Sequence, residues 1–299
     1  TGQVWYNSTS ATVKYFAVQS ASWATGGNMG TARYFLAGCG TQTAGLAFGG
    51  RTPPPSFGTN ATEEYGGTSW TAGGNLGTAR YNLSGCGTQT AALGFGANSP
   101  VNPEGVTEEY GGTSWTTGGT MGTGRNSLGG CGTQTAALAF GGSGPTTATE
   151  EYDGSSWTNG GALTTARNSL RGAGIQTAGL AFGGDNEKVN TEEYDGSSWT
   201  NGGNLNNGRE GLGNAGIQTA ALAFGGRPVG STGNKTEQYD GSSWTTTANM
   251  GSARYALGGG GTSTLALGFG GYGTASPAIT NATEEFSGGG PATFTVGTD

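Results

Sequence analysis

Residues 125–142 read RNSLGGCGTQTAALAFGG, an arginine followed by two short apolar stretches that glycines separate. β-formers alternate with small residues here, which favours two strands joined by a tight turn over a helix. The first strand is expected to run from just after the Arg to the Gly before Thr-Gln-Thr. The pattern recurs six times, with a Trp ten residues before the Arg and a Phe fifteen residues after it. The tryptophans are Trp23, Trp70, Trp115, Trp157, Trp199 and Trp244, and the arginines are Arg33, Arg80, Arg125, Arg167, Arg209 and Arg254.

The repeat unit is 42 to 47 residues long, and its variation in length is confined to the segment after the Phe. That segment leads to a third expected strand, Thr-Glu-Glu-Tyr, then to a hairpin turn of Asp-Gly-Ser-Ser or Gly-Gly-Thr-Ser, and a fourth strand begins at the Trp. Four strands in such a period are typical of a propeller blade. The sequence therefore predicts an all-β protein, a six-bladed β-propeller of four-stranded antiparallel blades.

Composition excludes several other classes. The chain has 65 Gly among 299 residues but only 9 Pro and no strict Gly-X-Y triplet, so it is not collagen. Its 7 Trp, 11 Tyr and 11 Phe supply large apolar groups that disordered chains lack. A net charge of −7 argues against a nucleic-acid partner. No apolar run approaches 18 residues, so membrane insertion is not expected.

The two ends of the repeat array are complementary. The first unit lacks a Glu-Glu-Tyr strand before Trp23, and the last has Phe286 in the Tyr position and Pro291 where a Trp would fall. We expect the ring to close by pairing of N- and C-terminal strands, with the fourth strand of the sixth blade coming from residues near Trp23. The alternative is that residues 292–296 supply that strand.

Three parts of the chain follow from this prediction. Residues 1–18 are expected to be a β-hairpin and attachment segment, with strands at 4–6 and 13–18. Residues 19–290 are the propeller, and residues 291–299 are a C-terminal edge strand and tail, with the strand at 293–296.

The order Gly141-Gly142, Tyr152, Trp157 and Arg167 resembles the kelch repeat of β-propellers, and the resemblance covers residues 23–286. More narrowly, the wording TEEYGGTSW and GTQTAALAFGG is similar to repeats in marine, cyanophage-type phage virion proteins, and residues 2–9, GQVWYNST, are similar to short β-segments of phage tail-fibre proteins. The resemblance implies a virion or extracellular location and partners among other virion proteins or host-surface glycans and proteins. Homo-oligomers through the terminal segments are a further possibility.

Catalytic chemistry is not expected, because the chain has no His. That absence removes the usual general base, the Ser-His-Asp triad and the commonest metal ligand. The kelch-like propeller of galactose oxidase needs His at its copper site, and the Asp-box of the six-bladed sialidases, Ser-x-Asp-x-Gly-x-x-Trp, does not fit the spacing around Asp153. We therefore expect no enzyme, no cofactor and no metal.

Residues that recur in register serve the repeat. The six Trp and six Arg are expected to be structural, with the Arg bridging blades through carboxylates or carbonyls. The glutamines at the turn between the first two strands could bind polar ligands or cap those turns; they are Gln42, Gln89, Gln134, Gln176 and Gln218, with Ser263 in the sixth unit. Cys39, Cys86 and Cys131 share one position where other units have Ala or Gly, so they should be buried free thiols; a three-thiolate metal site is the alternative.

The segments that vary between units are the best candidate for function. They span 51–61, 97–106, 143–148, 185–190, 227–235 and 272–282, and all should project from one face. A rigid scaffold with one face of differing loops is a common arrangement for recognition, although tolerant surface insertions would look the same. The candidate ligand-binding residues are Arg51, Phe57, Asn98, Glu104, Asp185, Glu187, Lys188, Arg227, Lys235 and Tyr272.

The function expected from these patterns is that of a non-enzymatic phage virion component, a fibre or decoration protein whose loop face binds a host surface or a neighbouring virion protein. A secreted bacterial lectin or adhesin that binds glycans through the same loops is the first alternative. A propeller glycosidase is the second, and the absence of His and of the Asp-box counts against it.

Overall fold

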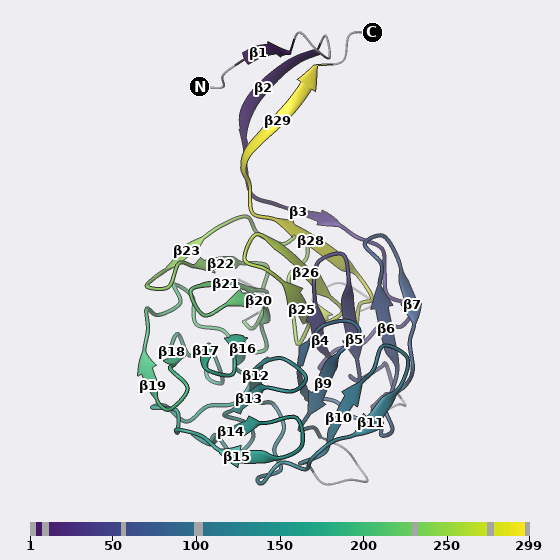
Figure 1. Cartoon of the computed structure of the whole chain (residues 1–299), viewed down its shortest axis with the longest axis vertical. Coiled ribbons are helices and arrows are strands. Elements are labelled where there is room, and N and C mark those ends of the chain that lie inside the picture. The colour runs from purple at the N-terminus through teal and green to yellow at the C-terminus, as the bar shows by residue number, and fades with distance from the viewer. Residues whose placement is uncertain are drawn as a thin grey trace.

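The computed structural model describes residues 4–7, 12–54, 58–98, 104–228, 233–273 and 278–296; for residues 4–18 and 290–296 it describes the backbone alone. Six four-stranded antiparallel sheets surround a central axis, and a ribbon of strands projects from the rim (Figure 1). No helix occurs among the described residues. The prediction of a six-bladed β-propeller is therefore confirmed.

Each of blades 1 to 5 is built from four consecutive strands, of which the first lies nearest the axis. Blade 1 contains β4 (Ala37–Gly40), β5 (Gly45–Phe48), β6 (Thr62–Tyr65) and β7 (Trp70–Ala72). Blade 2 contains β8 (Ser84–Gly87), β9 (Ala92–Phe95), β10 (Thr107–Tyr110) and β11 (Trp115–Thr117). Blade 3 contains β12 (Gly129–Gly132), β13 (Ala137–Phe140), β14 (Thr149–Tyr152) and β15 (Trp157–Asn159).

The remaining blades continue around the ring. Blade 4 contains β16 (Arg171–Ile175), β17 (Ala178–Phe182), β18 (Thr191–Tyr194) and β19 (Trp199–Asn201). Blade 5 contains β20 (Gly213–Ile217), β21 (Ala220–Phe224), β22 (Thr236–Tyr239) and β23 (Trp244–Thr246). A small ribbon of β24 (Arg254–Tyr255) and β27 (Tyr272–Gly273) precedes and follows the first two strands of blade 6.

Blade 6 closes the ring with strands from both ends of the chain. Its order is β25 (Gly258–Gly261), β26 (Leu265–Phe269), β28 (Thr283–Ser287) and β3 (Ser22–Thr25). Trp23 stands opposite Phe286 in the antiparallel register of β3 and β28, as Trp70 stands opposite Tyr65 in blade 1. The N-terminal segment therefore supplies the outer strand, and the alternative in which residues 292–296 supply it is wrong.

Those C-terminal residues instead belong to a stalk beside blade 6. The stalk is a three-stranded sheet in the order β1 (Val4–Asn7), β2 (Thr12–Gln19) and β29 (Gly290–Val296). Strand β2 lies in the middle and pairs antiparallel with both neighbours. Figure 1 shows this sheet extending away from the disc, with β1 at its far end. The ends of β1 and β29 thus lie together, remote from the propeller.

Glycine lets adjacent blades approach closely. A Cβ added to Gly85, in the first strand of blade 2, would lie 2.3 Å from Cζ of Phe48 in blade 1 and 3.1 Å from the backbone oxygen of Leu93. Gly38, Gly130 and Gly172 receive the Phe ring of the preceding blade in the same way. The apolar clusters between blades consist of such Phe, Leu, Tyr and Trp side chains, so the glycine excess belongs to the packed core.

Replacement of Gly85 by Ala is expected to lower the free energy of unfolding by about 1–3 kcal/mol, because the added methyl group must push the Phe48 ring away. Gly111→Ala is the matched control, since its Cβ would meet nothing closer than Ser114 O at 3.9 Å and its φ is not positive. Urea unfolding curves of both variants measure the difference. Equal midpoints for the two variants would contradict this view of the interface.

Candidate functional site on the loop face

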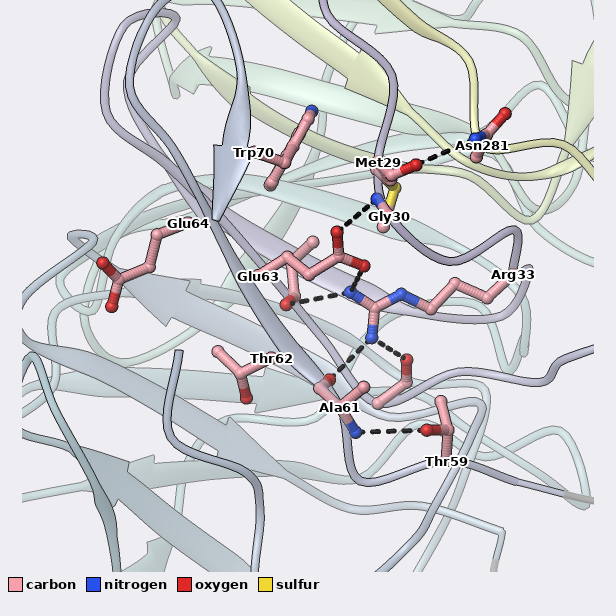
Figure 2. Close-up of polar contacts among 12 residues, drawn as sticks. Met29, Gly30, Arg33, Thr59, Ala61, Thr62, Glu63, Glu64, Trp70 and Asn281 are labelled. Carbon is pink, nitrogen blue, oxygen red and sulfur yellow. Dashed lines mark hydrogen bonds and ion pairs between the residues drawn. The ribbon is translucent and has the colours of Figure 1, made fainter. Parts of the chain in front are cut away.

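The side chains of the six repeat arginines are bonded within the propeller. Arg33 lies in the link between β3 and β4, and its Nη2 is 3.0 Å from Oε1 of Glu63 in β6. Its Nη1 donates to the carbonyl oxygens of Gly49 and Ala61, and Glu63 Oε2 accepts from Gly30 N at 2.6 Å (Figure 2). The same ion pair occurs in every blade, as Arg80–Glu108, Arg125–Glu150, Arg167–Glu192, Arg209–Glu237 and Arg254–Glu284.

The arginines were expected to bridge blades through carboxylates or carbonyls, but their side chains bond within a single blade. The guanidinium bonds stay within one blade, because Glu63, Gly49 and Ala61 all belong to blade 1. The link to the neighbouring blade is made by the backbone, since Arg33 O accepts from Gly271 N at 2.9 Å and Arg80 O accepts from Gly50 N at 2.9 Å. Each Arg thus holds the chain at the point where it passes from one blade to the next.

The second Glu of each Glu-Glu pair connects blades directly. Tyr152 Oη donates to Glu109 Oε1 of the preceding blade at 2.6 Å. Burial, and after it this hydrogen bond, raises the pKa of Tyr152 to about 12. Five of the six blade interfaces have this pair. Between blades 5 and 6, Gln238 replaces the Glu and Phe286 replaces the Tyr. The acceptor and the donor are therefore lost together, and no carboxylate remains without its partner there.

The glutamine ring is also structural. Gln89 Nε2 donates to the carbonyl oxygens of Gly45 and Tyr65, which belong to the preceding blade, at 3.0 and 2.8 Å. Gln42, Gln134, Gln176 and Gln218 make the equivalent bonds. They bond across the blade interface and do not cap their own turns. In the sixth unit Ser263 O accepts from Gln238 Nε2 at 3.2 Å.

The tryptophans pack between blades as expected. Trp115 lies 4.8 Å from Phe48 of blade 1, centroid to centroid, and its Nε1 donates to Thr62 Oγ1 at 2.9 Å. Every repeat Trp donates to a Thr of the preceding blade in this way. The side chains that recur in register therefore hold the ring together.

A closed ring of backbone hydrogen bonds, which we call the collar, surrounds the axis on the loop face, the face that carries the six variable segments. Its members lie two residues after each repeat Arg, and each donates its N–H to the carbonyl oxygen of the member in the neighbouring unit at 2.7–2.9 Å. All six have φ between 53° and 61°, the left-handed region. The collar consists of Phe35, Asn82, Ser127, Ser169, Gly211 and Ala256.

Aromatic and arginine side chains gather beside the collar. We define the aromatic patch as Tyr34, Phe35, Tyr81, Tyr255 and Tyr272 together with Arg51 and Arg227. Tyr34 lies 5.4 Å from Tyr272, which lies 5.6 Å from Tyr255, and Phe35 lies 4.9 Å from Tyr34, all between ring centroids. The patch joins elements of blades 6, 1 and 2 with the loop between β21 and β22 of blade 5.

Both arginines of the patch stack on tyrosines. The Arg227 guanidinium lies 4.1 Å from the centroid of Tyr255 and donates to its hydroxyl at 2.8 Å, while Glu210 lies 3.5 Å away. Arg51 lies 5.5 Å from the centroid of Tyr81. Such cation–π contacts hold the rings in place and leave a surface rich in Tyr and Arg. Residues of this kind are over-represented where proteins bind partners.

The other candidate residues make local contacts. Glu104 accepts from Asn126 Nδ2 at 2.9 Å, and Asp185 forms an ion pair with Lys188 at 3.2 Å and accepts from Asn168 N. Asn98 is paired with Tyr81 through the backbone, and Lys235 O accepts from Arg209 Nη1. These predicted residues are distributed around the ring in several small clusters. Phe57 lies outside the described residues.

A cavity of about 350 Å³ lies at the edge of this face, lined by Asn186, Glu187, Glu210, Arg227 and Pro228. Glu187 and Arg227 were candidates from the sequence, whereas Glu210 was not. Glu210, Tyr34, Tyr81 and Tyr255 share one repeat position, the residue after the Arg, and that position differs between units. A comparison of residue type at each fixed repeat position could have found these four residues. A comparison of segment lengths alone finds only the loops.

The three cysteines are buried free thiols on β4, β8 and β12, as predicted. Burial raises the pKa of Cys131 to about 12. No cluster of three or more metal-ligating side chains occurs in the part of the chain that the structure describes.

Raising the pH should lower the free energy of unfolding of the wild type relative to that of Cys131→Ala. Alanine is the natural residue at the equivalent positions Ala173 and Ala215. Because the unfolded thiol loses its proton near pH 9 and the folded thiol only near pH 12, the folded state retains a proton that the unfolded chain has lost, and stability falls between these values. The difference between the two proteins should narrow by on the order of 1 kcal/mol at pH 10. Urea unfolding from pH 7 to 10 checks this, and a constant difference would contradict it.

No protein-family model and no curated protein matches the chain. The class that the structure defines is a six-bladed β-propeller with a β-stalk. Among the described residues there is no helix that could span a membrane.

Proposed function

We propose that this propeller is a non-enzymatic component of a phage virion, a fibre or decoration module whose loop face binds a host surface or a neighbouring virion protein. The resemblance of its repeats to cyanophage-type virion proteins supports the proposal, as does the kelch-like order of Gly-Gly, Tyr, Trp and Arg. The absence of His supports a binding role over catalysis.

The aromatic patch is the observation that carries the proposal. The Arg, Glu, Gln and Trp residues that recur in every blade are bonded within the ring, so they offer little to a partner. On the loop face, by contrast, units differ in sequence, and the aromatic patch combines five aromatic rings with Arg51 and Arg227. Partly exposed aromatic rings on a rigid scaffold lose little conformational entropy on binding.

The stalk suits attachment. Its outer strands β1 and β29 each have one edge that no described strand covers, and uncovered edges can pair with strands of another chain. The stalk places the propeller at a distance from whatever its strands join (Figure 1). A homo-oligomer built through these strands is one form that the attachment can take.

Mass spectrometry of purified virions tests the location, and a host-binding assay tests the face. Recombinant protein is expected to bind host cells, or a virion protein from the same particles, and the double variant Arg227→Ala/Tyr255→Ala should lower binding at least about tenfold, as the loss of two central contacts would. Ile175→Thr is the matched control on the opposite face, since Thr41 and Thr88 occupy its position in other units. Absence of the chain from particles would defeat the virion role, and equal binding by both variants would defeat the role of the patch.

A secreted bacterial lectin or adhesin is the second candidate, and the tyrosine rings of the patch favour it, because sugar rings pack on aromatic faces. A glycan array with the wild type, Arg227→Ala/Tyr255→Ala and Ile175→Thr separates the candidates. Glycan binding that only the patch variant loses, by a chain absent from virions, would support the lectin. If the array shows no glycan binding, binding of a protein partner remains as the proposed role of the loop face.

A further inference from the structure

An axial channel lies along the centre of the propeller, and its cavity is smaller towards the loop face. On the loop face the collar surrounds the axis with its six backbone hydrogen bonds, and the leucines that follow it are buried: Leu36, Leu83, Leu128, Leu170, Leu212 and Leu257. Below this layer lies a cavity of about 20 Å³ lined by residues of all six blades, including Ala37, Ser84, Gly130, Arg171, Asn214 and Gly258. A wider mouth of about 90 Å³, lined by three residues from each first strand, opens on the opposite face.

Arg171 is the exception among the residues at its position. Four residues after the repeat Arg, the other units have Ala37, Ser84, Gly129, Gly213 and Gly258, all small. The Arg171 side chain lines the axial cavity and a second small cavity directly beneath the collar. Its Nε donates to Leu212 O at 2.7 Å and its Nη1 to Leu170 O at 3.2 Å.

The charged group of Arg171 differs from those of the repeat arginines in its surroundings. Each of the six repeat arginines has a Glu at 2.8–3.2 Å, whereas Arg171 forms no ion pair with any described residue. Burial lowers the pKa of Arg171 only to about 10, so the side chain is charged at neutral pH. The Arg171 side chain is half-buried and faces the axial cavity. A charge in such a site without a counter-charge is costly, and two carbonyl oxygens offset that cost in part.

A second polar exception lies next to Arg171. At the following repeat position five units have Gly, whereas blade 5 has Asn214, and both exceptions line the same cavity. Asn214 Nδ2 donates to Gly172 O at 2.6 Å, which fixes the amide beside the guanidinium. Arg171 and Asn214 are thus the longest polar side chains that line the axial cavity, and they come from adjacent blades.

We propose that the axial channel binds a monatomic anion, a halide such as chloride, between the Arg171 guanidinium and the cavity wall. A cavity of about 20 Å³ has room for one particle of water size. A halide meets this limit and supplies the missing negative charge, whereas phosphate or a carboxylate is too large for the inner cavity. The anion enters through the mouth opposite the loop face, which is the wider part of the channel.

Bromide provides the direct test, because its anomalous scattering distinguishes it from water. Crystals of the full chain soaked in sodium bromide should show one anomalous peak on the axis, within hydrogen-bond reach of the Arg171 guanidinium. Arg171→Gly, which restores the residue of blades 3, 5 and 6, should lose that peak. A channel that holds only water in the wild type would overturn the proposal.

Thermal unfolding provides the solution test. At constant ionic strength, replacement of sodium gluconate by sodium chloride should raise the midpoint of the wild type in a saturable manner, and apparent chloride affinity should fall at least about tenfold in Arg171→Gly and in Arg171→Met, as expected when a charged hydrogen bond is lost. Arg227→Ala is the control for a general effect of surface charge. An equal chloride response in all four proteins would show a non-specific salt effect and overturn the proposal. Neither outcome depends on the role of the loop face.

Discussion

Glu237→Gln is expected to lower the free energy of unfolding by about 3–5 kcal/mol, because it leaves a buried arginine without its counter-charge. Arg209 Nη2 lies 2.8 Å from Glu237 Oε1, and both side chains are fully buried. Glu237 Oε2 also accepts from Asn206 N at 2.7 Å, so the carboxylate ties the link between blades 4 and 5 to β22. Gln retains the shape and one acceptor, and the expected loss is therefore mainly that of the charge.

The reverse change isolates the other partner. Arg209→Met removes the donors to Gly225 O and Lys235 O as well as the ion pair, so it should cost at least as much. The double variant Arg209→Met/Glu237→Gln should cost less than the sum of the single variants, because it leaves no buried charge. Urea unfolding of the four proteins gives the coupling energy.

The surface pair of Lys188 and Asp185 is the control. Its side chains are 23% and 13% exposed, and the two residues are three apart in one loop. Lys188→Met should change stability by no more than about 1 kcal/mol. If Glu237→Gln cost no more than this control, the repeat ion pairs would not be what holds the links between blades.

The strands of the blades could be predicted well from the sequence. The third strand begins and ends with the Thr-Glu-Glu-Tyr motif, as in Thr62–Tyr65, and the fourth begins at the Trp. These elements have side chains that recur because each contacts the same neighbour in every blade. The first strand was expected directly after the Arg, yet β4 begins at Ala37, four residues later. The intervening residues turn through the left-handed region to form the collar.

The collar itself could not be predicted. Its bonds join backbone atoms, so the position tolerates Phe35, Asn82 and Ala256 alike, and no residue type marks it. The targets of Gln89 were also hidden, because its two acceptors are carbonyl oxygens of another blade. The candidate site was predicted in part: the variable loops led to Arg51, Arg227 and Tyr272, but Tyr34 and Tyr255 lie in a segment of constant length.

The ring depends on the seven residues 19–25, which carry β3. Trp23 Nε1 donates to Thr236 Oγ1 at 3.0 Å, and its ring lies 5.0 Å from Phe224 of blade 5 and 5.2 Å from Phe286, between centroids. Trp23→Ala in the full chain should therefore cost about 3–5 kcal/mol, as loss of a large aromatic contact does. Removal of β3 should lower the free energy of unfolding further. Strand β28 would then become an unpaired edge strand, and blade 5 would lose the strand that packs against it.

Two truncations separate the closing strand from the stalk. The chain 19–290 lacks β1 and nearly all of β2 and β29 but keeps β3, and it should unfold near the urea midpoint of the full chain. The chain 26–290 lacks β3 as well, and its midpoint should fall by more than that of Trp23→Ala, with aggregation through the open edge. Equal midpoints for the two truncations would show that the ring is held without its closing strand.

A third chain tests whether the lost strand is the cause. Phe286 and Pro291 are spaced as Tyr65 and Trp70 are, so the chain 26–293 with Pro291→Trp and Ala292→Thr ends in the sequence Trp-Thr-Thr, which forms β11 in blade 2. This chain can complete blade 6 from its own C-terminus, as the other five blades are completed. It should recover most of the stability lost in 26–290. Recovery would show that a strand with a Trp in register can close the ring from the C-terminal side, where in the natural chain residues 290–296 pair with β2 in the stalk.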